Sequence, residues 1–306
     1  MRKKKLAALK GIAAALCAFP LVFALAACGA QPEPKDEASA PPSATGTPAA
    51  QEPADEPADE PAAEVELQIF AANSLEKALP EVQALYTEAH PEVTFAETQF
   101  KASGDLVEQI GAGAQADLLI TASKGSMDTA SEQGAIAEGS RIDMFANDLV
   151  VVRAKGSDIA FSSLEDVRSD AFSKIAIGDA ATVPAGQYAN QALNSIGLYS
   201  DESGKDGAYD AAIEGKVVLA DKVGTAANYV ATGDCQIGFV YTSDIYRYDG
   251  IEAAFTVPAD AHKDIVYPGA ALQASEHGDV ADDFLVFCMT DPGAQAVWSQ
   301  YGFEVL

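Results

Sequence analysis

The chain has 306 residues, of which 48% are hydrophobic and 21% are charged; this is ordinary globular usage and suggests about two domains. These values exclude a wholly disordered chain, a collagen and a polytopic membrane protein. The formal net charge of −27 argues against nucleic acid as a partner, because contact with the phosphate backbone needs a basic patch. Three histidines and four cysteines are too few for a metal scaffold built from those residues.

The first 27 residues are organised like a secretory leader. A basic cluster opens the chain, and an uncharged run then extends from Gly11 to Ala27, which is short for a membrane span. The run ends in Leu25-Ala26-Ala27-Cys28 and resembles the lipobox of bacterial lipoproteins, in which cleavage precedes the cysteine and lipid is attached to it. We therefore expect a signal peptide over residues 1–27, a lipid on Cys28 and an extracytoplasmic, membrane-anchored protein. An ordinary signal peptide that happens to contain a cysteine is the alternative.

Residues 28–64 are expected to form a disordered tether that starts at the lipidated cysteine. After Cys28 this segment has no aromatic residue and no Val, Leu or Ile, and it holds eight of the fifteen prolines. Such a composition cannot bury enough apolar surface to offset the entropy of ordering. A proline-rich linker extends by ~3.1 Å per residue, so the tether could reach on the order of 100 Å.

Two cysteines remain in the part that is expected to fold, Cys235 and Cys288. An extracytoplasmic compartment permits a disulfide between them. Both lie in apolar runs, however, and a free cysteine often behaves as a small buried hydrophobe. The sequence leaves both possibilities open.

Strands and helices alternate from residue 65 onward. Apolar alternation and short apolar runs predict strands over residues 65–72, 93–100, 117–121, 149–152, 175–177, 216–219, 236–240, 255–257 and 265–272. Apolar residues at helical spacing predict helices that start at 74, 103, 184, 223, 280 and 294. In the first of them Ser74 is placed at the N-cap, and Pro80 should kink the helix or restart it. The alternation predicts an α/β fold with largely parallel sheets, divided into two halves.

Small polar turns connect several of these strands to the helices that follow them. Ser74, Ser103 and Ala185-Gly186 are the clearest cases. Helix N-termini present unpaired N–H groups and the positive end of the helix dipole, and ligands of α/β sheets bind at the carboxyl ends of strands. One such serine alone would be explained by capping of its own helix. Several together predict a site for a small anion that uses neither Arg nor Lys.

The motifs around these turns resemble those of the molybdate-binding proteins of molybdate ABC transporters. The segments that carry the resemblance span residues 65–306 in the family's order, and they are FAANSLEKAL, FKASGDLVEQIGAGAQADLLITAS, IGDAATVPAGQYANQAL, IGFVYTSD, HKDIVYPGA and the closing YGF. The resemblance implies two α/β lobes, each with a mostly parallel sheet, that close by a hinge motion on a tetrahedral oxyanion. The implied lobes are residues 65–148 with 257–306, and residues 149–256.

Five ligand-binding residues follow from this resemblance. Ser74 and Ser103 of the first lobe would give hydroxyl and backbone N–H donors. Ala185 and Val223 of the second lobe would give backbone N–H groups, and Tyr241 its phenol O–H. All five are donors, which suits a dianion that has no proton to give. Because the net charge repels a dianion at long range, affinity must come from local hydrogen bonds in a dry cleft.

Some of these positions have a simpler explanation or depart from the family pattern. The block around Val223 is weakly patterned, and Tyr241 alone could be a core residue. Asn73 stands where the family has a small residue, and it either adds a donor or only fits the turn. Lys101 is expected to be a solvated surface lysine rather than an oxyanion contact, and His262 to cap or pack.

The family implies a particular function and set of partners. The protein would capture molybdate or tungstate, which the sequence cannot separate, and would deliver it to the permease of an ABC importer. It would be a monomer with no cofactor, and molybdenum would be held only as the oxyanion, with no bare metal cation.

Two kinds of protein remain as alternatives. The fold also suits a binding protein for another solute, such as sulfate, phosphate or iron; an organic acid usually needs an Arg clamp, and no arginine lies in the candidate turns. A serine penicillin-interacting enzyme is suggested by Ser74-x-x-Lys77, by Tyr188-x-Asn190 and by the Lys222-Val223-Gly224 triplet. Val223 lacks the hydroxyl expected there and Gly224 opens a helix, so we expect no enzyme.

Overall fold

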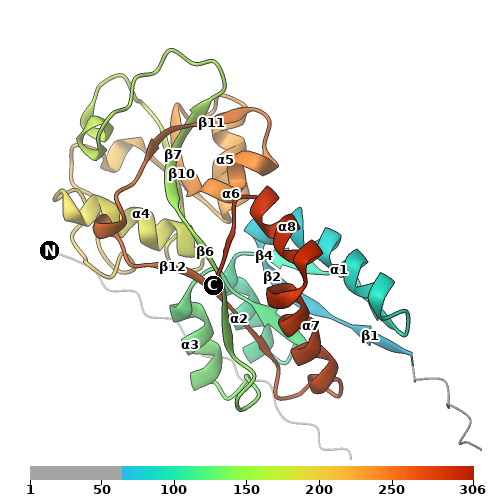
Figure 1. The fold of residues 1–306 in the computed structure, drawn as a ribbon. Coiled ribbons are helices and arrows are strands. Elements are labelled where there is room, and N and C mark those ends of the chain that lie inside the picture. The colour runs from blue at the N-terminus through green and yellow to red at the C-terminus, as the bar shows by residue number, and fades with distance from the viewer. Residues whose placement is uncertain (1–63) are drawn as a thin grey trace, which may run out of the picture. The chain divides into compact units, whose positions relative to one another are not determined.

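The computed structural model describes residues 64–306, with each element labelled in Figure 1. The predicted signal peptide, the predicted lipidation of Cys28 and the tether before Glu64 lie outside the described residues. Within residues 64–306, no helix has both the length and the apolar character needed to cross a membrane.

Two sheets organise the described residues. The first has the order β13-β6-β12-β5-β2-β4 and consists of β2 (Ile69–Ala72), β4 (Gln99–Lys101), β5 (Leu118–Ile120), β6 (Ile142–Asn147), β12 (Ile265–Ala271) and β13 (Glu304–Val305). The second has the order β11-β7-β10-β8-β9 and consists of β7 (Leu149–Ala154), β8 (Ile175–Gly178), β9 (Val217–Ala220), β10 (Ile237–Tyr241) and β11 (Ile251–Thr256). A short parallel pair joins β1 (Val65–Leu67) to β3 (Val93–Phe95). We call the six-stranded sheet with its helices the first lobe, and the five-stranded sheet with its helices the second lobe.

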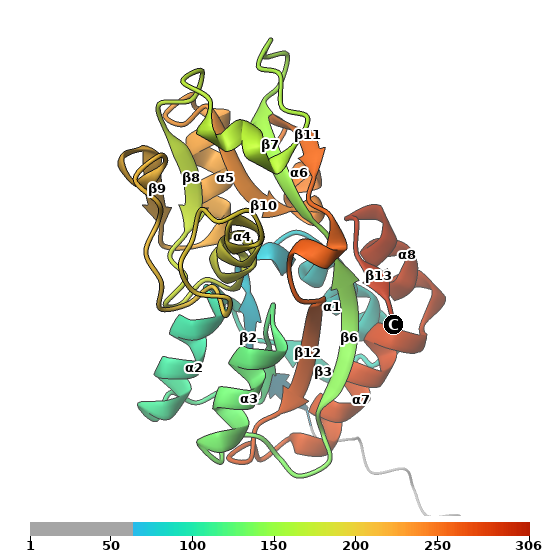
Figure 2. The same cartoon turned by 90° about the vertical axis from the view of Figure 1, so that its left-hand side faces the viewer.

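Helices cover both faces of each sheet (Figures 1 and 2). Those of the first lobe are the 3-10 helix η1 (Asn73–Leu75), α1 (Ala78–Ala89), α2 (Ser103–Gly111), α3 (Lys124–Glu132), α7 (Gly278–Thr290) and α8 (Pro292–Gln300). Those of the second lobe and its connections are η2 (Leu164–Arg168), α4 (Pro184–Ser195), η3 (Glu214–Lys216), α5 (Val223–Ala231), α6 (Thr242–Arg247) and η4 (Ala259–Ala261). In the first lobe α2 and α3 lie on one side of the sheet and α1, α7 and α8 on the other.

The central strands are buried on both faces, which explains why they read as continuous apolar runs. In β5, Leu118 and Ile120 belong to the large core cluster that also holds residues of α1, α7 and α8. Leu119 points to the opposite face, where it packs in the cluster formed with α2 and α3. This is the period of two that a strand imposes on its side chains.

The two-lobe α/β fold is confirmed, and each sheet combines parallel with antiparallel strand pairs. Parallel pairing joins β4, β2 and β5 in the first sheet and β9, β8 and β10 in the second. The strands near the points where the chain changes sheet pair antiparallel, as β6 does with β12 and β7 does with β10. The chain runs out of the first sheet in β6, enters the second in β7 and returns in β12.

Two of the predicted strands are each divided in the structure. The predicted strand 65–72 becomes β1, which pairs with β3, and β2, which pairs with β4 and β5. The break falls at Gln68, whose backbone N–H donates to Asp117 Oδ2 at 2.8 Å instead of to a strand neighbour. The predicted strand 93–100 is likewise divided into β3 and β4.

The prediction that Ser74 caps a helix is wrong. Ser74 lies inside the 3-10 turn η1, whose N-cap is Ala72, and α1 begins only at Ala78. Pro80 therefore occupies the first turn of α1, where its missing N–H leaves no helical hydrogen bond unmade. The helix restarts ahead of the proline, which is one of the two expected outcomes.

Cys235 and Cys288 are both free and buried, so the disulfide alternative is not formed. Burial raises the pKa of the Cys288 thiol. This thiol therefore behaves as a small hydrophobic side chain rather than as a reactive group.

Candidate functional site

The five residues predicted to bind a ligand meet at one small cavity between the two lobes. Each follows the carboxyl end of a different strand: Ser74 after β2, Ser103 after β4, Ala185 after β8, Val223 after β9, and Tyr241 at the last position of β10. All five line the cavity, together with Ala72, Asn73, Lys101, Ala102, Ala122, Val183 and Pro184. This is the place where open α/β sheets bind their ligands.

The cavity is small and secluded. It offers about 10 Å³ to the centre of a water-sized sphere, which is the room of about one water molecule. The five residues are at most 4% exposed. A compact ion suits such a space, whereas a peptide, a sugar or another organic solute needs a far larger one.

Ser103 is held so that its hydroxyl can donate into the cavity. It is the first residue of α2, where backbone N–H groups have no partner within the helix. Its Oγ accepts a hydrogen bond from the backbone N–H of Ala122 at 3.0 Å. Because an N–H group can only donate, the serine hydrogen is left for another acceptor.

Ala185 and Val223 contribute helix N-termini instead of side chains. Ala185 lies in the first turn of α4 after Pro184, and Val223 is the first residue of α5. The Val-Pro-Ala-Gly motif can reach the end of β8 because Gly178 and Gly186 have no side chains. A Cβ added to Gly186 would lie 1.9 Å from the carbonyl oxygen of Gly178. The motif thus places the positive end of the α4 dipole at the cavity.

Tyr241 brings a buried hydroxyl that lacks a partner. Its OH is one of three buried side-chain polar atoms in residues 64–306 without a hydrogen bond. Tyr188 and Tyr267 pack edge-on against its ring, with centroids 6.5 and 5.7 Å away. Burial raises the pKa of Tyr241 well above its ordinary value, so the phenol stays protonated. Leaving a buried donor unpaired is costly, so this hydroxyl calls for an acceptor such as a ligand oxygen.

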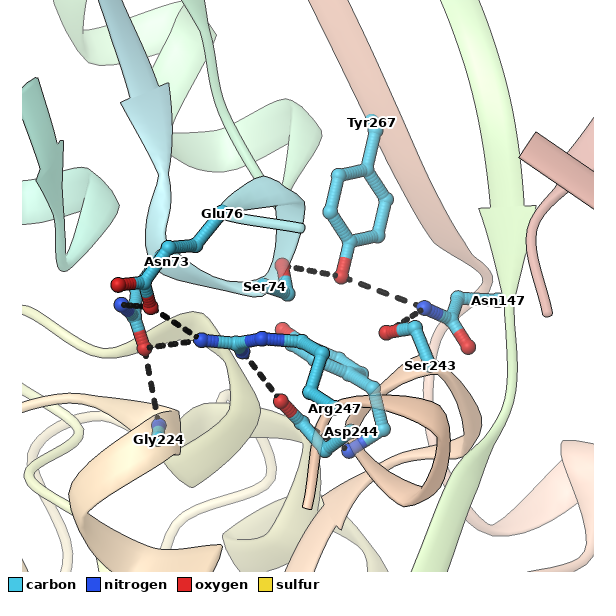
Figure 3. Close-up of polar contacts among 10 residues, drawn as sticks. Asn73, Ser74, Glu76, Asn147, Gly224, Ser243, Asp244, Arg247 and Tyr267 are labelled. Atoms are coloured by element: carbon cyan, nitrogen blue, oxygen red, sulfur yellow. Dashed lines mark hydrogen bonds and ion pairs between the residues drawn. The ribbon is translucent and has the colours of Figure 1, made fainter. Parts of the chain in front are cut away.

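Ser74 is joined to a residue that the sequence analysis did not single out. Its Oγ lies 2.9 Å from the hydroxyl of Tyr267 on β12, as Figure 3 shows. Tyr267 is fully buried. It lies in the HKDIVYPGA segment, and its position in that motif was the available signal, although nothing in the spacing connects it to Ser74.

The lobes touch directly around the cavity, so the structure is closed. The N–H of Gly104 in the first lobe donates to the carbonyl of Thr182 in the second at 2.9 Å. The N–H of Gly224 in the second lobe donates to Asn73 Oδ1 at 3.0 Å (Figure 3). Asn73 Oδ1 therefore serves as an acceptor between the lobes, and its Nδ2 donates to Glu76 Oε2 at 3.3 Å. Both ends of the side-chain amide are thus engaged within the protein.

An ion pair also bridges the lobes. Arg247 Nη2 lies 2.8 Å from Glu76 Oε2 of the first lobe, and Arg247 Nη1 lies 2.6 Å from Asp244 Oδ1 (Figure 3). Asp244 also accepts the backbone N–H of Tyr241 at 3.0 Å. Burial raises the pKa of the Asp244 carboxyl, and the Arg247 charge opposes this shift. Arg247 is thus neutralised by two carboxylates and does not line the cavity.

The one charged residue along the cavity is Lys101. Its side chain is exposed, and its Nζ donates to Gln109 Oε1 at 3.0 Å, in line with the solvated role expected for it. The donors that converge inside are therefore neutral hydroxyl and backbone N–H groups. His262 packs edge-on against Tyr188, with ring centroids 5.9 Å apart.

The arrangement expected of a serine penicillin-interacting enzyme is not assembled. Ser74 Oγ bonds to Tyr267, while Lys77 is exposed to solvent. The Lys222-Val223-Gly224 triplet begins a helix and does not lie on a strand.

The fold and the cavity between the lobes are those of a binding protein for a small solute, and sequence comparison agrees. The model of the bacterial extracellular solute-binding protein family matches residues 67–304. The chain belongs to this family.

Among individual relatives, the chain is 31% identical to the molybdate-binding protein ModA of Escherichia coli over 247 residues, which cover 79% of this chain and 90% of that protein. Among solved structures it is similar to the periplasmic molybdate-binding protein of Azotobacter vinelandii, with a TM-score of 0.65 and 21% identity, covering 78% of this chain and 98% of that one. The sulfate-binding protein SubI of Mycobacterium tuberculosis gives a TM-score of 0.64 at 17% identity, covering 78% and 86%. The fold alone therefore does not distinguish these anions.

Proposed function

We propose that this protein captures molybdate outside the cell and delivers it to an ABC importer, with tungstate as a second ligand of the same charge and shape. The observation that carries the proposal is the buried, unpaired hydroxyl of Tyr241. It lies in a cavity where neutral donors converge, and the charged residue of the lining, Lys101, donates to Gln109. The similarity to molybdate-binding proteins supports the choice of anion.

The proposed ligands are Ser74, Ser103, Ala185, Val223 and Tyr241. The two serine hydroxyls, the tyrosine hydroxyl and the backbone N–H groups of Ser74, Ser103, Ala185 and Val223 would each donate to a ligand oxygen. Hydrogen bonds to an ionised acceptor are short and strong, and a dry cavity strengthens them further. A fully deprotonated tetrahedral dianion is the ligand that such a set of donors can satisfy.

The proposed cycle uses a hinge between the lobes. Residues 65–148 with 257–306 would move as one body and residues 149–256 as the other. The supporting observation is that the strands of each sheet fall within one of these groups. Opening would break the Gly104–Thr182 and Asn73–Gly224 contacts and admit the anion.

The proposed setting is the outer face of the cell membrane. The lipobox at Cys28 would anchor the protein through its lipid, and the tether would let the monomer reach the permease. We propose no cofactor and no bare metal ion; within residues 64–306 no cluster of three or more His, Cys, Asp or Glu side chains could hold one.

Calorimetric titration of the purified, ligand-stripped protein tests the proposal. Molybdate and tungstate should bind tightly and sulfate weakly, because donors that fit the larger anions would leave the smaller sulfate with longer hydrogen bonds. Tight binding of sulfate with silent molybdate would replace the proposal by the sulfate alternative. No heat with any of the three anions would overturn oxyanion capture itself.

A further inference from the structure

We propose that Tyr267 and Asn147 are positioning residues that fix the Ser74 hydroxyl as a donor toward the cavity, so that the site rejects oxyanions that carry a proton. This inference rests on the proposed function. It concerns a chain of hydrogen bonds behind the ligand residues, drawn in Figure 3.

The direction of the Ser74–Tyr267 hydrogen bond decides what Ser74 can do. The two oxygens are 2.9 Å apart and either could donate. If Ser74 donated to Tyr267, its single hydrogen would be used and its oxygen would face the anion with lone pairs. If Tyr267 donates, the Ser74 hydrogen is free for the ligand.

Asn147 settles the direction. Its Oδ1 accepts the backbone N–H of Asp148 at 2.9 Å, which assigns the other end of the amide as Nδ2. Nδ2 donates to Ser243 Oγ at 2.9 Å and to Tyr267 OH at 3.4 Å. An amide NH₂ group cannot accept, so the Tyr267 oxygen receives this bond and its hydrogen must be placed elsewhere.

Ser74 Oγ is the acceptor at hydrogen-bonding distance for the buried Tyr267 hydrogen, since the neighbouring Tyr241 hydroxyl makes no hydrogen bond within residues 64–306. Tyr267 is fully buried, so its O–H cannot turn to solvent, and a buried donor without an acceptor is costly. Among the hydrogen bonds of residues 64–306, the remaining partner of this hydroxyl is Ser74 Oγ. Burial also raises the pKa of Tyr267, which keeps the proton on the phenol. Each residue therefore donates to the next, from Asn147 to Tyr267 and from Tyr267 to Ser74, and Ser74 donates into the cavity. We call this chain of hydrogen bonds the relay.

Both serines of the site are then oriented in the same way. Ser103 accepts the Ala122 N–H and Ser74 accepts the Tyr267 O–H, so each presents its own hydrogen. A ligand oxygen that carries a proton would meet donors where it needs an acceptor. Discrimination against a protonated oxyanion is large because its binding would leave buried polar groups unpaired.

The relay is also anchored where the chain passes between the sheets. Asn147 is the last residue of β6, Tyr267 lies on β12, and Ser243 lies on α6 of the second lobe. The orientation of Ser74 is therefore held by the strands that connect the lobes rather than by its own short turn.

The first test is a double-mutant cycle on molybdate affinity. Tyr267→Phe removes the relay hydroxyl and keeps the ring, and we expect the Kd for molybdate to rise roughly fivefold to tenfold. In a Ser74→Ala background the same change should have no further effect, because Tyr267 acts through Ser74. Tyr86→Phe, the same change at a buried tyrosine of α1 that does not line the cavity, should leave the Kd unchanged.

The second readout is selectivity, which a purely structural role of Tyr267 would not alter. Sulfate and hydrogen phosphate carry the same charge and have nearly the same size, but only the latter has a proton. Each is measured by competition against bound molybdate. The wild-type protein should prefer sulfate, and in Tyr267→Phe this preference should shrink severalfold, because Ser74 can then turn and accept. A preference that is unchanged in Tyr267→Phe would overturn the inference.

The outcomes separate this inference from the proposed function. If the wild-type protein does not bind molybdate, the proposed function fails and the relay falls with it. If the wild-type protein binds molybdate and Tyr267→Phe binds it equally well, the relay alone is wrong. The relay is also wrong if Tyr267→Phe weakens molybdate binding as much in the Ser74→Ala background as in the wild-type background. Should Tyr267→Phe not fold, Asn147→Leu keeps the size and removes the donor, and it should show the same dependence on Ser74.

Discussion

Tyr241 shows how a single residue can indicate a ligand. Its hydroxyl is buried without a partner, while the neighbouring hydroxyl of Tyr188 has one partner and that of Tyr267 has two. Its ring is held between those two aromatic neighbours, so the hydroxyl cannot rotate away from the cavity. A core role alone would have favoured phenylalanine at this position.

Replacing Tyr241 by phenylalanine should therefore weaken molybdate binding by about 1–3 kcal/mol, the usual value of a hydrogen bond to a charged group. Calorimetry measures the change. Tyr188→Phe is the matched control: it removes a hydroxyl from the adjacent ring, which does not line the cavity, and it should leave the affinity nearly unaltered. Equal affinities of Tyr241→Phe and the wild-type protein would remove Tyr241 from the site.

Sequence reasoning found the residues that face the cavity but not the ones behind them. Ser74, Ser103, Ala185, Val223 and Tyr241 could be located because each sits in a short motif next to a strand end, and the structure brings all five to one cavity. Their role as ligands stays a prediction. Tyr267, Asn147 and Arg247 were not identified, because their contacts join residues that lie 96 to 193 positions apart. No local pattern encodes such pairs.

Among the elements, the start of α2 is built for close contact with the second lobe. Gly104, the second residue of the helix, has its N–H bonded to the Thr182 carbonyl. A Cβ added to Gly104 would lie 2.6 Å from the Thr182 Cα. This backbone belongs to the other lobe, so the clash would exist in the closed form and disappear on opening.

Gly104→Ala should consequently impair closure without harming either lobe. We expect binding to weaken by about 1–3 kcal/mol, the usual cost of overpacking, while the Tm of the ligand-free protein does not fall. Gly125→Ala places the same change at the second residue of α3, where a Cβ would meet nothing within 4 Å, and it should be silent. If Gly104→Ala and Gly125→Ala bind molybdate alike, closure does not use this contact.

Secondary structure was predictable where apolar patterns were long, but the boundaries of the helices and strands were not predictable. Nearly all predicted strands and helices exist, yet Ser74 lies in a 3-10 turn because Asn73 and Glu76 serve contacts between the lobes. The helices α3 and α6 and the strands β6 and β13 were missed. In α3 few residues are buried, and β6 mixes buried with half-exposed positions, so neither gives a clear period.

At the scale of the whole molecule, buried tyrosines link stability to pH. Burial raises the pKa of Tyr188, Tyr209, Tyr241 and Tyr267. In the unfolded chain these groups titrate near pH ~10. Below that pH both states are protonated and the stabilisation is fully present; above it the unfolded chain loses protons that the folded protein retains, so the free energy of unfolding falls as pH rises.

Chemical unfolding from about pH 8 to pH 11 measures this dependence. We expect a decline in the free energy of unfolding that begins near pH 10 and is shallower in Tyr209→Phe, which removes one titrating group away from the cavity. Lysines titrate in the same range, so the difference between the two proteins is the informative quantity. If the free energy of unfolding depends on pH in the same way in the wild-type protein and in Tyr209→Phe, Tyr209 does not contribute to the decline.

We propose that closure of the two lobes encloses molybdate among Ser74, Ser103, Ala185, Val223 and Tyr241. Anomalous diffraction at the molybdenum edge, from crystals of the protein grown with molybdate, tests this most directly. We expect one strong peak inside the closed cavity, with the oxygens of the bound anion within hydrogen-bonding distance of the three hydroxyls. A peak confined to the surface groove lined by Lys124, Lys205 and Lys263, with the cavity empty, would contradict it.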